Sequence, residues 1–142
     1  MNIHFVCRGN TFRSRIAEAY LNSKSIPEIT ATSSGIYAGI KLNGPIDWYA
    51  MRIIFNNHLV SGMSACWEKT NTEIFKSKDL IIFMSKRHYE FCHDFIGDVP
   101  YEIWDIEDMP EIFEDAQLIA KSESVFMQIS GNVEVLLSKL QA

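Results

Sequence analysis

The sequence is short of several features, and each shortage excludes a class of protein. It has three cysteines, four prolines and seven glycines among 142 residues, which is too few for a disulfide-stapled, collagen-like or low-complexity chain. Its 13 basic residues are outnumbered by 18 acidic ones, so a nucleic-acid partner is not expected. No apolar stretch is long enough to span a bilayer, and no signal segment opens the chain. We therefore expect no membrane partner either.

The three cysteines, Cys7, Cys66 and Cys92, are scattered and lack the spacing of metal ligands. An odd number of unpaired cysteines is typical of a reducing compartment. We expect a cytoplasmic protein with no metal and no cofactor.

Apolar runs and helical periodicity alternate along one uninterrupted domain, residues 1–142. Strands are predicted at Ile3–Val6, Ile29–Ser33, Leu80–Met84 and Tyr101–Trp104. Helices are predicted at Arg13–Ser23, within PIDWYAMRIIFNN after Pro45, at Asn71–Lys78, from Ser85 to about Ile96, and from Glu111 to Leu140, where Ser130-Gly131 could break the helix.

Alternating strands and helices predict an α/β fold: a parallel sheet with helices on both faces. In such sheets the functional loops lie at the carboxyl ends of the strands. Cys7, Ser34-Gly35, Ser85 and the segment Asp105–Asp108 all fall at such ends. Their convergence at one edge of the sheet is the first indication of a site.

The stretch HFVCRGNTFRS places Cys7 between a predicted strand and a predicted helix. Amide groups in such a loop can bind an anion, helped by the positive end of the helix dipole. Gly9 and Asn10 both tolerate unusual backbone angles, and Arg13 offers a charged fork that matches phosphate oxygens. The pattern predicts a phosphate-binding loop.

The same positive surroundings favour the thiolate form of Cys7, which would then be a nucleophile facing a bound phosphate ester. Ser14 could donate a hydrogen bond to the sulfur and steady it as a leaving group. A lone cysteine is usually a small buried apolar residue. The spacing of cysteine, five residues, arginine and serine favours the catalytic interpretation.

At these residues the chain resembles the low-molecular-weight protein tyrosine phosphatases, whose loop reads Cys-x-Gly-Asn-x-Cys-Arg-Ser. The stretches RIAEAYL, SSGIYAG and KDLIIFMSKRH resemble the family's first helix, its Ser-Ala-Gly-Thr segment and its Asp-Leu-Ile strand. The resemblance implies a single-domain, three-layer sandwich with a four-stranded parallel sheet, flavodoxin-like in topology. It also implies hydrolysis of protein phosphotyrosine, and of aryl phosphates, through a phosphocysteine on Cys7.

The resemblance further implies that Arg13 clamps the transition state. The expected substrate-binding residues are Arg8, Gly9, Asn10, Thr11, Phe12, Ser14 and Tyr37. Phosphate or sulfate is expected to bind in the loop.

A proton donor for the leaving oxygen is expected in WDIEDMPE, where family members carry an Asp-Pro pair after a Trp-containing strand. Counting from Trp104 gives Asp108 as the general acid and base, although Met109 separates it from Pro110. Asp105 is the second choice, and Glu107 is a nearby competitor.

The chain departs from the family's pattern in several places. Phe12 replaces the second loop cysteine, so protection of the nucleophile by a disulfide is not implied. Cys66 and Cys92 are expected to be inert. No histidine stands where the family supports its loop asparagine, so Ser34 is suggested as a support for Asn10. The family's Tyr-Tyr pair is absent; Tyr37 could stack on a substrate ring, whereas Trp48 is expected in the core.

Two alternatives stay open. Arsenate reductases share the loop but need closely spaced cysteines beyond the third strand, where this chain has only Cys92. The altered acid loop would also suit a module that binds phosphotyrosine without turnover. The resemblance suggests bacterial tyrosine kinases as protein substrates.

Overall fold

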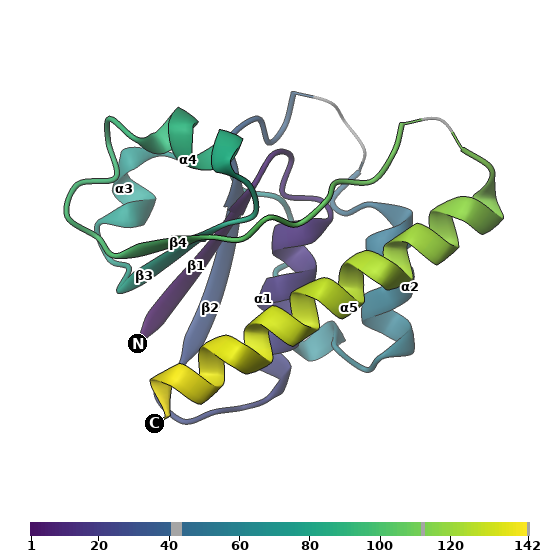
Figure 1. Cartoon of the computed structure of the whole chain (residues 1–142), viewed down its shortest axis with the longest axis horizontal. Coiled ribbons are helices and arrows are strands. Elements are labelled where there is room, and N and C mark those ends of the chain that lie inside the picture. The colour runs from purple at the N-terminus through teal and green to yellow at the C-terminus, as the bar shows by residue number, and fades with distance from the viewer. Residues whose placement is uncertain (41–43, 112, 142) are drawn as a thin grey trace.

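The computed structural model describes residues 1–40, 44–111 and 113–141. Its sheet has four parallel strands in the order β2-β1-β3-β4 (Figure 1). The strands are β1 (Asn2–Cys7), β2 (Thr30–Gly35), β3 (Leu80–Phe83) and β4 (Tyr101–Ile103). The predicted parallel sheet is confirmed, although β2 extends to Gly35, two residues beyond its expected end.

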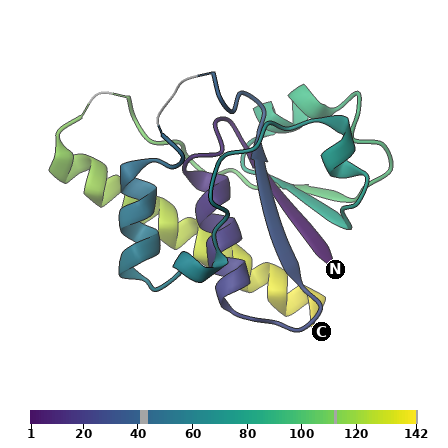
Figure 2. The same ribbon diagram turned by 180° about the vertical axis from the view of Figure 1, so that it is seen from behind.

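Helices cover both faces of the sheet, as the alternating pattern predicts. One face carries α1 (Arg13–Ser23), α2 (Trp48–Asn56) and α5 (Asp115–Leu140), with a 3₁₀ turn at Val60–Gly62. The other face carries the shorter α3 (Thr72–Phe75) and α4 (Lys86–Cys92). Figures 1 and 2 show the two groups from opposite sides of the molecule. The result is a three-layer sandwich.

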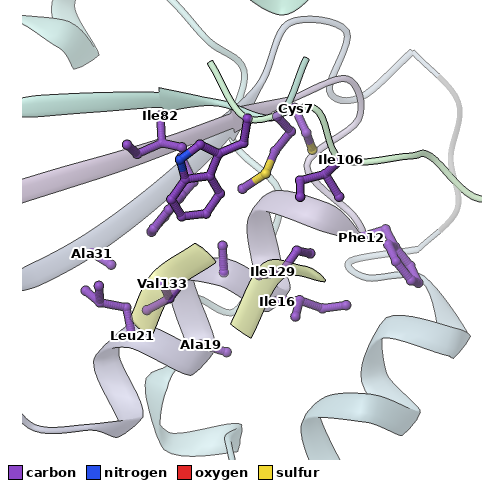
Figure 3. Close-up of a cluster of buried hydrophobic side chains, with 14 of the residues drawn as sticks. Cys7, Phe12, Ile16, Ala19, Leu21, Ala31, Ile82, Ile106, Ile129 and Val133 are labelled. Carbon is purple, nitrogen blue, oxygen red and sulfur yellow. The ribbon is translucent and has the colours of Figure 1, made fainter. Parts of the chain in front are cut away.

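Side-chain alternation along β1 divides the core into two clusters. Phe5 and Cys7 point into the larger cluster, which also contains Ile16 of α1 and Ile129 of α5 (Figure 3). Val6, between them, joins the smaller cluster beneath α3 and α4. Burial on both faces explains why apolar residues point to both sides of this strand, with His4 as the polar exception between Ile3 and Cys7.

Two details of the helices correct the sequence predictions. The last helix runs unbroken through Gly131 and begins at Asp115 rather than Glu111, because Glu114 and Gln117 form a capping box there. Trp48 was expected in the core but is 66% exposed. It is the first residue of α2, whose buried side carries Ala50, Ile53 and Ile54, so Trp48 projects from the opposite side.

Both termini lie at the amino ends of the strands, away from the loop that follows β1 (Figures 1 and 2). Within residues 1–40, 44–111 and 113–141, no helix combines the length and the hydrophobicity needed to cross a membrane.

Candidate functional site

The loop between β1 and α1 is held in shape by Asn10. This residue is fully buried and has a positive φ of 56°, a conformation that asparagine tolerates better than most residues. Its side-chain nitrogen donates to Ser14 Oγ at 2.7 Å and to Ser33 Oγ at 2.9 Å. Its side-chain oxygen accepts from the Glu68 amide at 2.8 Å. Every polar atom of the amide is therefore used to fix the loop.

Ser34 is not the support of Asn10 that was suggested; its neighbour Ser33 takes that place. Successive residues of β2 face opposite sides of the sheet. Ser33 faces α1, while Ser34 faces the other side and bonds to His4 Nε2 at 2.7 Å and to Thr70 Oγ1 at 2.6 Å. The backbone of Glu68 supplies the rest of the support, a contribution that no side-chain pattern could reveal.

Arg15 ties the loop to two other segments from behind. This fully buried side chain donates to the carbonyls of Asn10 at 3.2 Å, Pro45 at 2.8 Å and Ser64. Burial lowers the pKa of its guanidinium, and the nearby Glu18 carboxylate opposes that shift. Sequence reasoning did not single out Arg15, because its spacing is that of an ordinary helix residue.

The sulfur of Cys7 lies at the carboxyl end of β1, with Ser14 Oγ 2.9 Å away. Because Asn10 already donates to that oxygen, the hydroxyl hydrogen of Ser14 is free to point to the sulfur. A donor aimed at Sγ stabilises negative charge on it.

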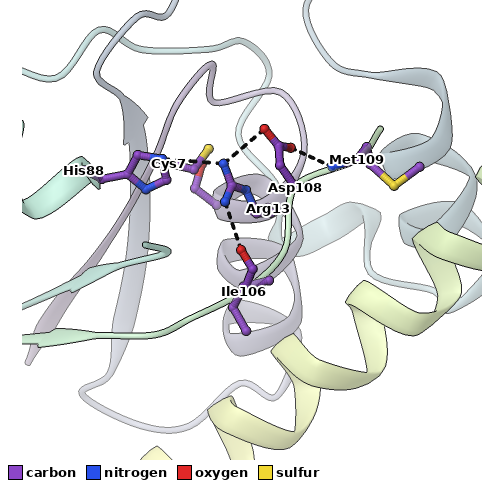
Figure 4. Close-up of polar contacts among 7 residues, drawn as sticks. Cys7, Arg13, His88, Ile106, Asp108 and Met109 are labelled. Carbon is purple, nitrogen blue, oxygen red and sulfur yellow. Dashed lines mark hydrogen bonds and ion pairs between the residues drawn. The ribbon is translucent and has the colours of Figure 1, made fainter. Parts of the chain in front are cut away.

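Three groups from separate segments surround the guanidinium of Arg13 (Figure 4). Nη1 donates to the Ile106 carbonyl at 3.0 Å. Nη2 lies 3.3 Å from Asp108 Oδ2 and 3.5 Å from His88 Nε2. Arg13 itself is 4% exposed. A buried, permanently charged group is thus held beside the cysteine sulfur.

Asp108 is the carboxylate that faces this arrangement. Its second oxygen accepts from the Met109 amide at 2.8 Å, and half of its side chain is exposed. Glu107 instead pairs with Lys121, and Asp105 is exposed to solvent. The inserted Met109, which follows Asp108 directly, packs against the larger core cluster.

A pocket of about 910 Å³ opens over the loop. Most of the predicted site residues line this pocket: Cys7, Arg8, Gly9, Thr11, Phe12, Arg13, Tyr37 and Asp108. Asn10 and Ser14 lie behind the loop and are fully buried. Tyr37 is 40% exposed and meets Phe91 edge-on, with ring centroids 5.4 Å apart.

Asp47, a residue that sequence reasoning missed, also lines the pocket. It caps α2, accepting from the Tyr49 amide at 2.8 Å, and its own amide donates to the Thr11 carbonyl at 3.0 Å. Burial raises the pKa of its carboxyl, and the negative charge of Asp108 adds to the shift. An Asp just before a helical pattern is a cap signal, but only the fold shows that it reaches the pocket.

His88 is a further residue that sequence reasoning missed, and no local pattern marks it. It is 3% exposed in α4. Burial, followed by the positive charges of Arg13, Arg87 and Arg8, lowers the pKa of its ring to about 3. The ring is therefore neutral at neutral pH.

The remaining cysteines lie apart from this arrangement. Cys92 belongs to the smaller core cluster, and burial raises the pKa of its thiol to about 12. Cys66 is exposed, and none of the three cysteines is in a disulfide. In the described part of the chain, no group of three or more His, Cys, Asp or Glu residues is placed to hold a metal ion.

Comparison with known families gives one match over nearly the whole chain. Residues 2–142 match the family described as "Low molecular weight phosphotyrosine protein phosphatase".

Individual relatives have low sequence identity to the chain. A protein-arginine-phosphatase of Bacillus subtilis is 30% identical over 100 residues, which are 68% of this chain and 64% of that protein. The chain thus matches slightly less than two thirds of this curated relative.

Solved structures share the fold at lower identity. The phosphatase Wzb of Escherichia coli K30 in complex with sulphate has a TM-score of 0.75 at 20% identity, covering 98% of this chain and 97% of that one. A mutant of the Bacillus subtilis arginine phosphatase YwlE, in which serine replaces the active-site cysteine and is phosphorylated, has a TM-score of 0.71 at 22% identity, covering 96% of this chain and 95% of that one.

Proposed function

Because the chain belongs to the low molecular weight phosphotyrosine protein phosphatase family, we propose that it is a phosphatase, which removes phosphoryl groups from protein side chains through a phosphocysteine on Cys7. One observation carries this proposal: the Cys7 sulfur, the Arg13 guanidinium and the Asp108 carboxylate, from three segments of the chain, line one pocket. The YwlE mutant, in which a serine that replaces the active-site cysteine is phosphorylated, supports a covalent step of this kind.

In the first step the Cys7 thiolate attacks phosphorus, the sulfur–phosphorus bond forms and the bond to the leaving atom breaks. Asp108 gives its proton to that leaving atom. Arg13 and the loop amides bind the phosphoryl oxygens, where charge gathers in the transition state.

In the second step Asp108 takes a proton from water while the oxygen attacks the phosphocysteine. The products are inorganic phosphate and the Cys7 thiolate. Ser14, which lies 2.9 Å from the sulfur, donates a hydrogen bond to the departing thiolate and lowers the barrier of this step.

Phosphotyrosine is the substrate favoured by the family. The pocket has aromatic walls in Phe12, Tyr37 and Tyr49, which suit the edge-to-face packing of a phenyl ring. A cytoplasmic bacterial tyrosine kinase is a suitable protein substrate within this proposal, and the three unpaired cysteines fit such a reducing location.

Phosphoarginine is a second candidate, because the pocket also has acidic lining residues. Asp47, Asp108 and Glu111 all line it, and carboxylates pair well with a guanidinium leaving group. The curated relative is an arginine phosphatase, which supports the same candidate.

One peptide synthesised with either phosphotyrosine or phosphoarginine at its centre separates these candidates. Hydrolysis of the tyrosine form with the higher kcat/KM supports the first, and the reverse order supports the second. Asp47→Asn, which removes a carboxylate but keeps its shape, should lower kcat/KM for phosphoarginine more than for phosphotyrosine. Binding of both peptides without phosphate release would refute the proposed function and leave a binding module.

A further inference from the structure

His88 is a buried polar side chain that the proposed reaction does not use. It lies on α4, on the face of the sheet opposite α1, yet its Nε2 reaches to 3.5 Å from Arg13 Nη2. Contacts of this kind are often long in unliganded enzymes and shorten when substrate binds. Two residues that are 75 positions apart in sequence therefore meet at the guanidinium.

The chemistry of the contact fixes the state of the imidazole. Arginine only donates hydrogen bonds, so Nε2 must carry a lone pair and the proton must be on Nδ1. A protonated ring would place a second positive charge 3.5 Å from Arg13 in a buried position, which is unfavourable. The lowered pKa of the ring agrees with this neutral form.

A neutral hydrogen-bond acceptor beside Arg13 Nη2 suits phosphoryl binding better than a charged acceptor would. A buried carboxylate would cancel much of the charge that Arg13 needs to bind phosphoryl oxygens. An apolar side chain would leave one guanidinium N–H without a partner, at a cost in free energy. An imidazole accepts from the N–H and leaves the positive charge free to act on an anion. Its own Nδ1 is buried without a hydrogen-bond partner among the described residues, so the contact with Arg13 is the one that gives this buried ring a polar role.

Asp108 is a different kind of partner for the same nitrogen. Half of its side chain is exposed, and in the proposed reaction it must turn from Arg13 to the leaving atom. At that moment Nη2 keeps only its buried contact with the imidazole. The Ile106 carbonyl holds the other nitrogen, Nη1, at 3.0 Å.

We propose that His88 is a positioning residue, which holds Nη2 of Arg13 toward the phosphoryl oxygens while Asp108 transfers its proton. The inference rests on the proposed function, in which Arg13 binds those oxygens. It adds a residue from the opposite face of the sheet to the phosphate-binding machinery.

The test compares His88→Leu, which removes the acceptor, with His88→Gln, which keeps an acceptor at a similar reach. Vanadate binding is measured by titration and kcat is measured with p-nitrophenyl phosphate. We expect His88→Leu to weaken vanadate binding and lower kcat by about 10-fold or more, and His88→Gln to restore most of both. His4→Leu removes a second buried histidine, which bonds to Thr32 and Ser34 instead. It should leave vanadate binding unchanged.

A double-mutant cycle shows whether the effect passes through Arg13. In an Arg13→Met background, His88→Leu should cause no further loss of vanadate affinity. An equal loss in both backgrounds would overturn the proposal, as would a folded His88→Leu protein that binds vanadate like the wild type. Failure of His88→Gln to restore binding, with its melting temperature intact, would also overturn it. Vanadate binding needs no turnover, so a wild-type protein that hydrolyses nothing would refute the proposed function and still allow this test.

Discussion

At the scale of single residues, Asp108 is distinguished from its acidic neighbours by its contacts. It lies 3.3 Å from Arg13 and lines the pocket, whereas Glu107 pairs with Lys121. The segment WDIEDMPE narrowed the choice of acid to three carboxylates, and only the path of this irregular segment in the fold separates them. That path includes the packing of Met109 against the core, which sequence spacing cannot encode.

Replacing Asp108 and Asp105 by asparagine, one at a time, tests the assignment of Asp108 as the general acid. Asp108→Asn should lower kcat for a phosphotyrosine peptide by about 10²–10⁴-fold, the usual contribution of a positioned acid. Asp105→Asn, at an exposed position, should keep nearly full activity. Steady-state kinetics on both variants is sufficient. A large loss in Asp105→Asn alone would show that the acid has been assigned to the wrong residue.

At the scale of elements, the end of β2 and the loop after β1 are built against each other. An added Cβ on Gly35 would lie 2.6 Å from the Asn10 nitrogen and 2.7 Å from the Arg8 oxygen. These are backbone atoms of the phosphate-binding loop, which cannot move aside as the end of a flexible side chain could. The bare backbone at residue 35 therefore permits the loop to adopt its shape.

Gly35→Ala should lower the free energy of unfolding by about 1–3 kcal/mol and lower kcat/KM by roughly 10²-fold, because small displacements of reacting groups are costly. Urea denaturation and steady-state kinetics measure the two effects. Gly131→Ala is the control, since an added Cβ meets nothing within 4 Å inside α5. It should stabilise the protein by up to about 1 kcal/mol. If Gly35→Ala behaved like this control, the loop would not depend on the close approach.

Most elements could be predicted from the sequence because their patterns are local. The run LIIFM marks β3, and the spacing of Ile16, Ala17 and Tyr20 marks α1. The exposure of Trp48 and the continuity of α5 through Gly131 could not be predicted. Trp48 shares its helical spacing with core residues, and packing alone decides which side of a short helix is covered. Gly131 lowers helix propensity, but Val125, Ile129 and Val133 are buried, and their packing outweighs it.

The candidate site also has one part that local sequence predicts and one part that only the fold brings together. Cys7, Arg13 and Ser14 lie close in sequence, so their placement around one loop was predictable. Asp47 and His88 reach the loop only through the fold, and so do the contacts of Arg15 with Pro45 and Ser64. Asn10 was correctly marked as a loop residue, but its support came from Ser33 and a backbone amide rather than from Ser34.

At the scale of the whole molecule, two buried histidines couple stability to pH. The pKa of His4 is lowered to about 3 by burial, with Lys78 adding to the shift, and the pKa of His88 is lowered to a similar value. In the unfolded chain each ring binds a proton near pH 6.5. Between about pH 6.5 and pH 3 the unfolded chain binds protons at these rings that the folded chain does not bind, so a falling pH favours unfolding. Stability is thus complete above about pH 6.5 and is lost as the pH falls toward 3.

We expect each histidine to cost about 3 kcal/mol of unfolding free energy between pH 7 and pH 4. His4→Gln should therefore show a shallower fall than the wild type when urea midpoints are compared across this range. The buried carboxyls of Glu18 and Asp47, whose pKa values are raised by burial, act in the opposite direction, equally in both proteins. His93→Gln, at an exposed site, is the control. Identical slopes for wild type and His4→Gln would contradict the account.

The central claim, that Cys7 carries the phosphoryl group, has a direct test. Asp108→Asn protein is mixed with p-nitrophenyl phosphate, whose leaving group needs little protonation, and the reaction is stopped in acid within milliseconds. Peptide mass spectrometry should then find the phosphoryl adduct on Cys7, with none on a Cys7→Ala protein and an undiminished amount on Cys66→Ser. An adduct on another residue, or turnover without any adduct, would contradict the account.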